Sequence, residues 1–322
     1  GTRLVAGRAT QLELLDPRSL KSSRLLDGPG GHINDVGFSR DGSVLFAAGG
    51  EPGLFGEVRL LDAKDLSVKL TIRGHRDSLY AAALSPDGRV LATGSYDRTI
   101  RLWNAADGKP LLTLKGHNGA VFDLAFHPGG KILASASGDR TVKLWNTADG
   151  RRLDTFNEPT REQYAVAISP DGRYVVAGGV DNRIRAWEIL EGGREGTNPV
   201  RFSRFAHKQS ILALEFSPDG LALVSSSEDR SVKVWETKTF TQRRQLPLQP
   251  DWPSALAITP GGRRIIVGRL DGSLAAYELD PATLAAAGAA TPVTGSPVPK
   301  PHEGDPKAKL SESVEAEPNN TS

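Results

Sequence analysis

The chain has 322 residues, and its 40 basic and 38 acidic side chains leave a formal net charge of +2. This near balance argues against a phosphate-binding surface for nucleic acid and against electrostatic attachment to an anionic membrane. Cysteine is absent, which excludes disulfides, thiolate metal sites and covalent haem attachment within this chain. No apolar run is long enough to span a bilayer. Methionine is absent too, including at position 1, so we expect a piece of a longer protein.

The N-terminal residues predict an incomplete structural unit. Short strand-like segments occupy residues 4–7, 11–16 and 23–26. They match the second, third and fourth strands of a repeat that follows along the chain. We therefore expect this unit to lack its innermost strand, which would come from upstream of Gly1 or from the stretch after Asp280.

From residue 31 onward the chain is built from one repeat. Its clearest copies run from Gly74 to Trp103 and from Gly116 to Trp145, with equivalent residues 42 positions apart. A Ser-Pro-Asp-Gly type of turn recurs in each copy, and its Pro and Gly residues suit a tight turn between two strands. Each period holds four strand-like segments, as in residues 80–84, 90–93, 100–103 and 110–114. A repeat of 40–45 residues with four strands is the signature of a β-propeller blade.

The repeats predict an all-β fold, a seven-bladed β-propeller of four-stranded antiparallel blades, with the ring closed by the N-terminal strands. We expect the propeller to cover residues 1–285, with a partial blade at 1–30 and six further blades at 31–73, 74–115, 116–157, 158–205, 206–248 and 249–285. Residues 286–322 are rich in Pro and Ala, and we expect a disordered linker there.

A set of polar and aromatic residues recurs in fixed register. The three complete sets are His75, Ser95, Asp97 and Trp103; His117, Ser137, Asp139 and Trp145; and His207, Ser227, Asp229 and Trp235. They resemble the structural tetrad of the WD-repeat propeller family, and the resemblance covers about 280 residues. It implies that the Asp caps a tight turn and accepts from the His, that the His bonds the Ser, and that the Ser bonds the indole N–H. His, Ser and Asp also suggest a hydrolase triad, but three copies beside a Trp, without a Gly-x-Ser-x-Gly elbow, favour the structural role.

Some blades depart from this set. Trp187 stands in a repeat that has Gly179 for the Ser and Pro159 for the His. Tyr277 and Leu61 occupy the Trp position of two other repeats. We expect the blades at residues 1–30, 31–73 and 249–285 to be the softer part of the ring.

The resemblance implies that partners dock on the face around the central channel. Its residues there are identified as Tyr80, Tyr96, Phe122, Glu162, Tyr164, Glu228 and Trp252. Clustered aromatics with charged neighbours are the usual anchors of a protein or peptide interface. The alternative interpretation is that these rings plug the mouth of the channel.

The sequence therefore predicts a non-catalytic interaction scaffold, a monomeric module of a larger bacterial protein that binds a protein or peptide partner. We expect no cofactor, no nucleic acid and no membrane insertion. The arginines that follow the tetrad Asp residues are interpreted as solvated residues of the turns and not as ligands of a phosphate backbone. The alternative is a propeller enzyme or metal-binding propeller that uses the central channel, although His32 is the only histidine left for its mouth. A calcium ion held by carbonyls stays open. Residues 315–321 resemble the start of a bacterial pre-peptidase C-terminal domain, which favours an extracytoplasmic location, periplasmic or secreted.

Overall fold

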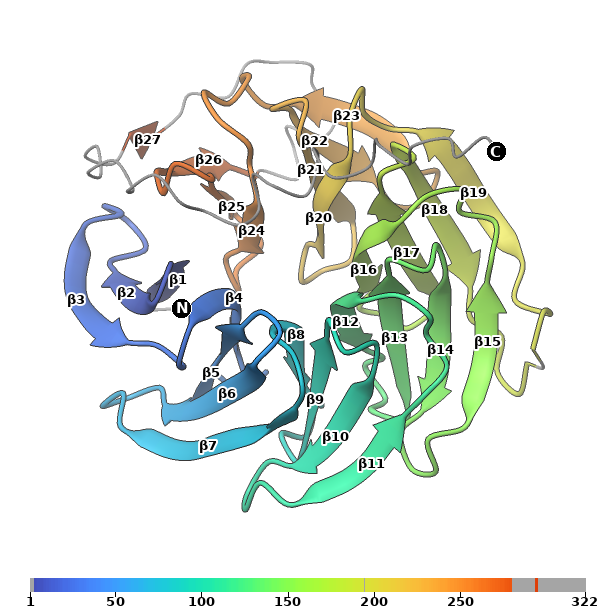
Figure 1. Cartoon of the computed structure of the whole chain (residues 1–322). Helices are drawn as coiled ribbons and strands as arrows, with labels where there is room; N and C mark the ends of the chain where they lie inside the picture. Colours follow the sequence, from blue (N-terminus) through green and yellow to red (C-terminus); the bar gives the residue numbers. More distant parts are fainter. Residues whose placement is uncertain (1–2, 194, 280–292, 295–322) are drawn as a thin grey trace, which may run out of the picture.

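The computed structural model describes residues 3–193, 195–279 and 293–294 of the chain. These residues form β-strands, turns and loops, arranged as seven antiparallel sheets around a central axis (Figure 1). The predicted all-β, seven-bladed propeller is confirmed. Within the described ranges, no helix is long and apolar enough to cross a membrane.

The seven sheets follow one another in chain order. The N-terminal blade contains β1 (Leu4–Arg8), β2 (Gln11–Leu15) and β3 (Ser22–Asp27). Blades 1 to 3 contain β4 (His32–Phe38), β5 (Val44–Glu51), β6 (Phe55–Asp62) and β7 (Val68–His75); β8 (Leu79–Leu84), β9 (Val90–Ser95), β10 (Ile100–Asn104) and β11 (Pro110–Leu114); and β12 (Val121–Phe126), β13 (Ile132–Ser137), β14 (Val142–Asn146) and β15 (Arg152–Phe156). Blades 4 to 6 contain β16 (Gln163–Ile168), β17 (Tyr174–Gly179), β18 (Arg183–Glu188) and β19 (Val200–Phe205); β20 (Ile211–Phe216), β21 (Ala222–Ser227), β22 (Val232–Glu236) and β23 (Thr241–Gln245); and β24 (Ala255–Ile258), β25 (Arg264–Gly268), β26 (Leu274–Glu278) and β27 (Val293–Thr294).

The Ser-Pro-Asp-Gly segments form the turn between the first and second strands of a blade. In blade 2, Ser85 Oγ donates to Asp87 Oδ1 at 2.6 Å and accepts from Val90 N at 2.9 Å. Gly88 has a φ of +69°, which glycine adopts without steric penalty. The Ser, Asp and Gly of this motif therefore each have a physical role in ending β8 and starting β9.

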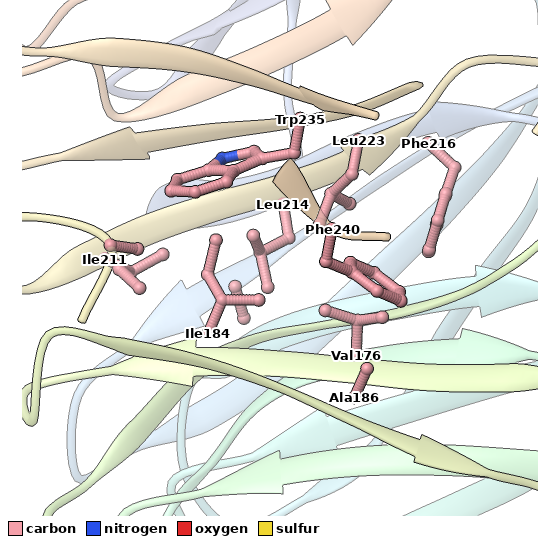
Figure 2. Close-up of a cluster of buried hydrophobic side chains, with 11 residues drawn as sticks. Val176, Ile184, Ala186, Ile211, Leu214, Phe216, Leu223, Trp235 and Phe240 are labelled. Carbon is pink, nitrogen blue, oxygen red and sulfur yellow. The ribbon is translucent and has the colours of Figure 1, made fainter. Parts of the chain in front are cut away.

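The hydrophobic core lies between neighbouring blades. Figure 2 shows the cluster between blades 4 and 5, where Val176 and Ile184 of blade 4 lie close to Trp235, Leu223 and Phe240 of blade 5. Because each sheet buries its faces against the sheets beside it, a blade depends on its neighbours for its core.

The N-terminal blade lacks an innermost strand among the described residues, as predicted. Gly7 on β1 faces Ile33 as Gly94 on β9 faces Val121, so β1 holds the second-strand position. Contacts with blade 6 close the ring, including a hydrogen bond of 3.1 Å from Arg264 Nη1 to Pro17 O.

The outer strand of blade 6 corrects the predicted linker. Val293–Thr294 pairs with β26, whereas the sequence interpretation placed these residues in a linker and ended the blade at residue 285. The backbone edge of β26 supplies the pairing partner that composition cannot reveal. The rest of residues 286–322, including the segment 315–321, lies outside the described residues.

Candidate interaction face and the tetrads that support it

One hydrogen-bonded chain connects a surface turn of blade 2 to its buried indole. Asp97 Oδ2 lies 2.9 Å from His75 Nδ1, and Asp97 Oδ1 accepts from Thr99 Oγ1 at 2.6 Å. His75 Nε2 lies 2.8 Å from Thr93 Oγ1, and the same oxygen accepts from Trp103 Nε1 at 2.8 Å. With Nδ1 protonated toward Asp97, the Thr93 hydroxyl donates to Nε2 and accepts from the indole. Each buried polar atom of this hydrogen-bond network, in His75, Thr93 and Trp103, therefore has a partner.

The identification of Ser95 as the tetrad hydroxyl was wrong. Its Oγ donates to the carbonyl oxygens of Asp77 and Ser78, at 3.0 Å each, and accepts from Asp97 N at 3.1 Å. Thr93 and Ser95 lie on the same side of β9, because side chains two residues apart share a face. Only Thr93 lies level with the imidazole and the indole; Ser95, at the end of the strand, reaches the backbone instead.

Blade 3 repeats this arrangement. Ser135 Oγ lies 2.7 Å from His117 Nε2 and accepts from Trp145 Nε1 at 2.8 Å. His117 Nδ1 lies 2.8 Å from Asp139 Oδ2. Ser137, which the sequence interpretation placed in the tetrad, donates to Gly119 O instead. That assignment was wrong for the same reason as in blade 2.

Blade 5 has the third complete set. Ser225 Oγ accepts from Trp235 Nε1 at 2.9 Å and lies 2.7 Å from His207 Nε2. His207 Nδ1 lies 3.4 Å from Asp229 Oδ2 and 2.9 Å from Ser231 Oγ. Ser227 donates to a backbone carbonyl, so its predicted tetrad role was also wrong. A hydroxyl recurring at 93, 135 and 225 was the sequence signal that could have found the correct residues.

Blade 4 lacks this chain of hydrogen bonds. Ala177 occupies the hydroxyl position, and Trp187 Nε1 has no hydrogen-bond partner among the described residues. The indole stacks on Phe156 with ring centroids 4.6 Å apart. Asp181 pairs with the buried Arg185 at 2.7 Å. An ion pair and a stacked ring pair thus replace the tetrad.

Blade 6 has a different replacement. Tyr277 Oη receives a hydrogen bond of 3.1 Å from Gln249 Nε2. Gln249 Oε1 accepts from Arg269 Nε and Nη2 at 3.0 and 2.8 Å. Gln249 stands at the position of the tetrad His, so this blade keeps a buried network with other side chains.

The tetrads favour the charged form of Asp97 and Asp139 and the neutral form of His117 and His207. Burial alone would raise the pKa of Asp97 and Asp139, but hydrogen bonds from the neighbouring His and Thr hold each pKa well below its usual value. Burial lowers the pKa of His117 and His207 despite the nearby carboxylates. A structural network, rather than a proton-transfer site, is the result.

Four aromatic side chains meet at the end of the innermost strands that lies beside the tetrad turns. We name Tyr96, Tyr80, Phe122 and Tyr164 the aromatic row. Tyr80 lies 6.0 Å from Tyr96 and 5.5 Å from Phe122, and Phe122 lies 5.2 Å from Tyr164, measured between ring centroids. These contacts cross from β8 to β12 to β16, which lie side by side around the centre of the ring (Figure 1). The row therefore spans blades 2 to 4.

The aromatic row lies outside the hydrophobic core. None of its rings belongs to the core clusters of the described residues. Tyr96 is 45% exposed, and the other three rings are half-buried. Gly138 leaves room for the row, because a Cβ there would approach the Phe122 ring to 3.2 Å. The rings are thus positioned by one another and by a backbone that leaves them space.

Two carboxylates lie close to one end of the row. Burial raises the pKa of Tyr164, and the negative charges of Glu228 and Glu162 raise it further. Both glutamates are half-buried, and neither forms an ion pair with a cation in the described part of the chain. Trp252, on the loop before β24, is 37% exposed and has no ring contact with the row among the described residues. The structure therefore brings together six of the seven predicted residues and leaves Trp252 apart.

Sequence reasoning missed three acidic residues on the innermost strands. Asp35 and Asp123 each accept a hydrogen bond of 2.8 Å from the backbone of the next blade. Glu215 and Asp123 line a cavity of about 340 Å³ between β12, β16 and β20. Burial raises the pKa of Asp123 to about 8 and that of Glu215 to about 7. An acidic residue inside an apolar strand segment was the available signal. Across residues 3–193, 195–279 and 293–294, no group of His, Asp and Glu is arranged as a metal site.

Comparison with known families agrees with this geometry. Four segments match the family model described as WD domain, G-beta repeat, at residues 66–104, 108–146, 150–188 and 199–236. Four WD repeats therefore lie within this β-propeller. Each matched segment begins near the outermost strand of one blade and ends after the third strand of the next, so the family's repeat straddles two blades of the WD-repeat propeller.

Two longer proteins share a short stretch with this WD-repeat chain. The intraflagellar transport protein 122 homolog of Homo sapiens is 32% identical over 68 residues, and that of Danio rerio is 35% identical over 68 residues. The match covers 21% of this chain and 5% of each relative. The chain therefore spans only a small part of the length of these relatives.

Proposed function

We propose that this WD-repeat propeller is a non-catalytic scaffold that binds a protein or peptide partner at the aromatic row and at the adjacent Glu162 and Glu228. One observation carries the proposal: four aromatic rings contact one another outside the core, on innermost strands of neighbouring blades. WD-repeat propellers generally bind protein partners. Among the described residues, the aromatic row is the largest group of contacting aromatic rings outside the hydrophobic core.

The geometry suits an interface. Aromatic side chains dominate binding energy because they remove a large area from water, and their few rotatable bonds lose little entropy. The rings of Phe122 and Tyr164 meet at 88°, edge to face, so each restricts the other before a partner arrives. Preorganisation of this kind lowers the free-energy cost of association. Trp252 would then be a separate, peripheral contact.

Two observations support a scaffold rather than an enzyme. His75, His117 and His207 are each committed to a tetrad, with both ring nitrogens in use. Ser95, Ser137 and Ser227 bond backbone carbonyls, so no serine of these sets is held by a free histidine base. The proposed placement of the propeller as a monomeric module of a larger bacterial protein, in an extracytoplasmic compartment, stays a prediction from the sequence.

The test compares the wild-type propeller with a Tyr80→Ala, Phe122→Ala, Tyr164→Ala variant in affinity capture from lysate fractions of the source cell. A matched control carries Val68→Ala, Leu111→Ala and Phe205→Ala, which remove exposed apolar groups from outer strands. Circular dichroism establishes that all three are folded. The proposal expects a protein retained by the wild type and the control and lost from the aromatic variant. Equal retention by all three, or unfolding of the aromatic variant alone, would refute the assignment.

A further inference from the structure

The chemistry of the aromatic face indicates which residue a partner would insert there. Resting on the function proposed above, we infer that the anchor of the partner is a cationic side chain of a peptide segment, arginine in preference to lysine. It would lie against Tyr164 and Phe122, with its charge facing Glu162 and Glu228.

Two carboxylates lie at the Tyr164 end of the row. Glu162 stands two residues before Tyr164, and Glu228 N donates to Ser210 O at 3.0 Å just before β20, the innermost strand beside β16. Both glutamates therefore lie near Tyr164, and their negative charges raise the pKa of its hydroxyl. Neither has an ion-pair partner within the described residues, although both are half-buried. A partly desolvated carboxylate without a counter-ion attracts a cation more strongly than one in free water. Two such carboxylates beside one ring make this the preferred position for a positive charge.

The rings of the row offer aromatic faces to a partner. Phe122 stands at 88–89° to the rings on either side of it, so the row presents ring faces in two directions. A cation over an aromatic face is attracted by the ring quadrupole. The planar guanidinium of arginine can stack on such a face and donate to carboxylates at the same time, which the ammonium of lysine cannot. The combination of flat rings and two acids therefore favours arginine.

Further charged and acidic residues lie below and around the row. Asp123 follows Phe122 directly, and Asp123 and Glu215 line the cavity between the innermost strands. Cations occur farther out: Arg98, Arg140 and Arg230 are exposed and lie in the turns between the second and third strands. The acidic groups thus lie at and below the row, and the arginines of these turns lie at the rim. A basic anchor flanked by neutral or acidic residues would complement this pattern.

The test uses a displayed library of random twelve-residue peptides. Selection against the wild-type propeller is followed by titration of the enriched peptides by fluorescence polarisation. The variants are the triple aromatic variant described above, a Glu162→Gln, Glu228→Gln variant, and a control with two exposed acids elsewhere neutralised, Asp149→Asn and Glu191→Gln.

The inference expects enriched peptides to share one arginine. Binding should weaken at least tenfold when that arginine is replaced by citrulline and in the Glu162→Gln, Glu228→Gln variant, but should stay within twofold in the control. Peptides that need the aromatic row, carry no shared basic residue and tolerate the glutamine variant would overturn the inference and leave the proposed function standing. Failure to enrich any peptide that depends on the row would overturn both.

Discussion

A single oxygen, Thr93 Oγ1, lies 2.8 Å from both the indole nitrogen of Trp103 and Nε2 of His75. This oxygen joins the turn held by Asp97 to the core between blades 1 and 2, where Trp103 packs. The same arrangement at Ser135 and Ser225 makes the hydroxyl of the second strand, rather than the serine at its end, the central member of each tetrad.

Replacing Ser135 by Ala removes the acceptor of the Trp145 indole and should cost about 1 to 3 kcal/mol of unfolding free energy, because two buried polar groups lose their partner. The Trp145 indole proton should shift in the NMR spectrum and exchange faster with solvent. The Ser137→Ala variant serves as the control, since Ser137 bonds the backbone and not the indole. An indole signal that responds to Ser137→Ala and not to Ser135→Ala would contradict the assignment.

Blade 4 offers the reverse experiment. Ala177 stands where the other blades carry the hydroxyl, and the Trp187 indole nitrogen is buried without a partner in the described chain. An Ala177→Ser substitution supplies an acceptor and should stabilise the protein by about 1 kcal/mol in urea unfolding. Ala92→Ser is the matched control and should destabilise, because buried Ala92 packs in the cluster of Trp145, whose indole nitrogen already donates to Ser135. A loss of stability in Ala177→Ser would show that the site cannot accept the hydroxyl.

The tetrads predict a steep loss of stability in acid. The pKa values of Asp97, Asp139 and Asp229 are lowered in the folded state, so the unfolded chain binds protons first as the pH falls. Their contribution is present above the unfolded value of 3.8 and is lost as the pH decreases below it. The lowered pKa values of His117 and His207 add a loss that begins below 6.5. Urea unfolding of Asp139→Asn should show a shallower dependence between pH 5 and pH 3 than the wild type; an unchanged slope would exclude Asp139 as a source.

Glu215 changes the stability of the fold in the opposite direction as the pH varies. Its pKa is raised to about 7 by burial, so its protonated form is favoured by folding. The stability this provides is present below the unfolded value of 4.5 and is lost as the pH rises through about 7. The Glu215 side chain is exposed to water inside the ring of blades. Its effect on the free energy of unfolding is therefore smaller than that of a carboxyl group shielded from water. A Glu215→Gln substitution should raise the melting temperature at pH 8 by a few degrees and change it little at pH 5. Glu191→Gln should change neither, and a larger gain at pH 5 than at pH 8 would contradict the account.

Much of this architecture could be predicted from the sequence because it repeats. Equivalent residues 42 positions apart must occupy the same level of neighbouring blades, which is why Phe122 and Tyr164 could be expected to meet. The same reasoning placed His75, Asp97 and Trp103 together.

Periodicity alone could not decide between Thr93 and Ser95. Both recur as hydroxyls in the same repeat and both face the same side of β9, so the choice depends on how the strand pairs with β10. Trp252 lies before β24 of blade 6, two blades beyond the end of the row at Tyr164, and it has no ring contact with the row among the described residues. Composition similarly hid β27, because two residues in a Pro- and Ala-rich stretch become a strand only where β26 presents an open edge.

Site-specific photocrosslinking tests the central claim most directly. A benzophenone side chain is introduced in place of Tyr96, which is 45% exposed within the row, or in place of Phe205 on the outer strand β19, which is 66% exposed. After irradiation in a lysate of the source cell, we expect a discrete crosslinked protein at position 96 and none at 205. Excess unlabelled wild type should abolish the crosslink, and the triple aromatic variant should not. A partner captured at position 205 alone, or equally at both positions, would contradict the claim that this propeller binds through its aromatic row.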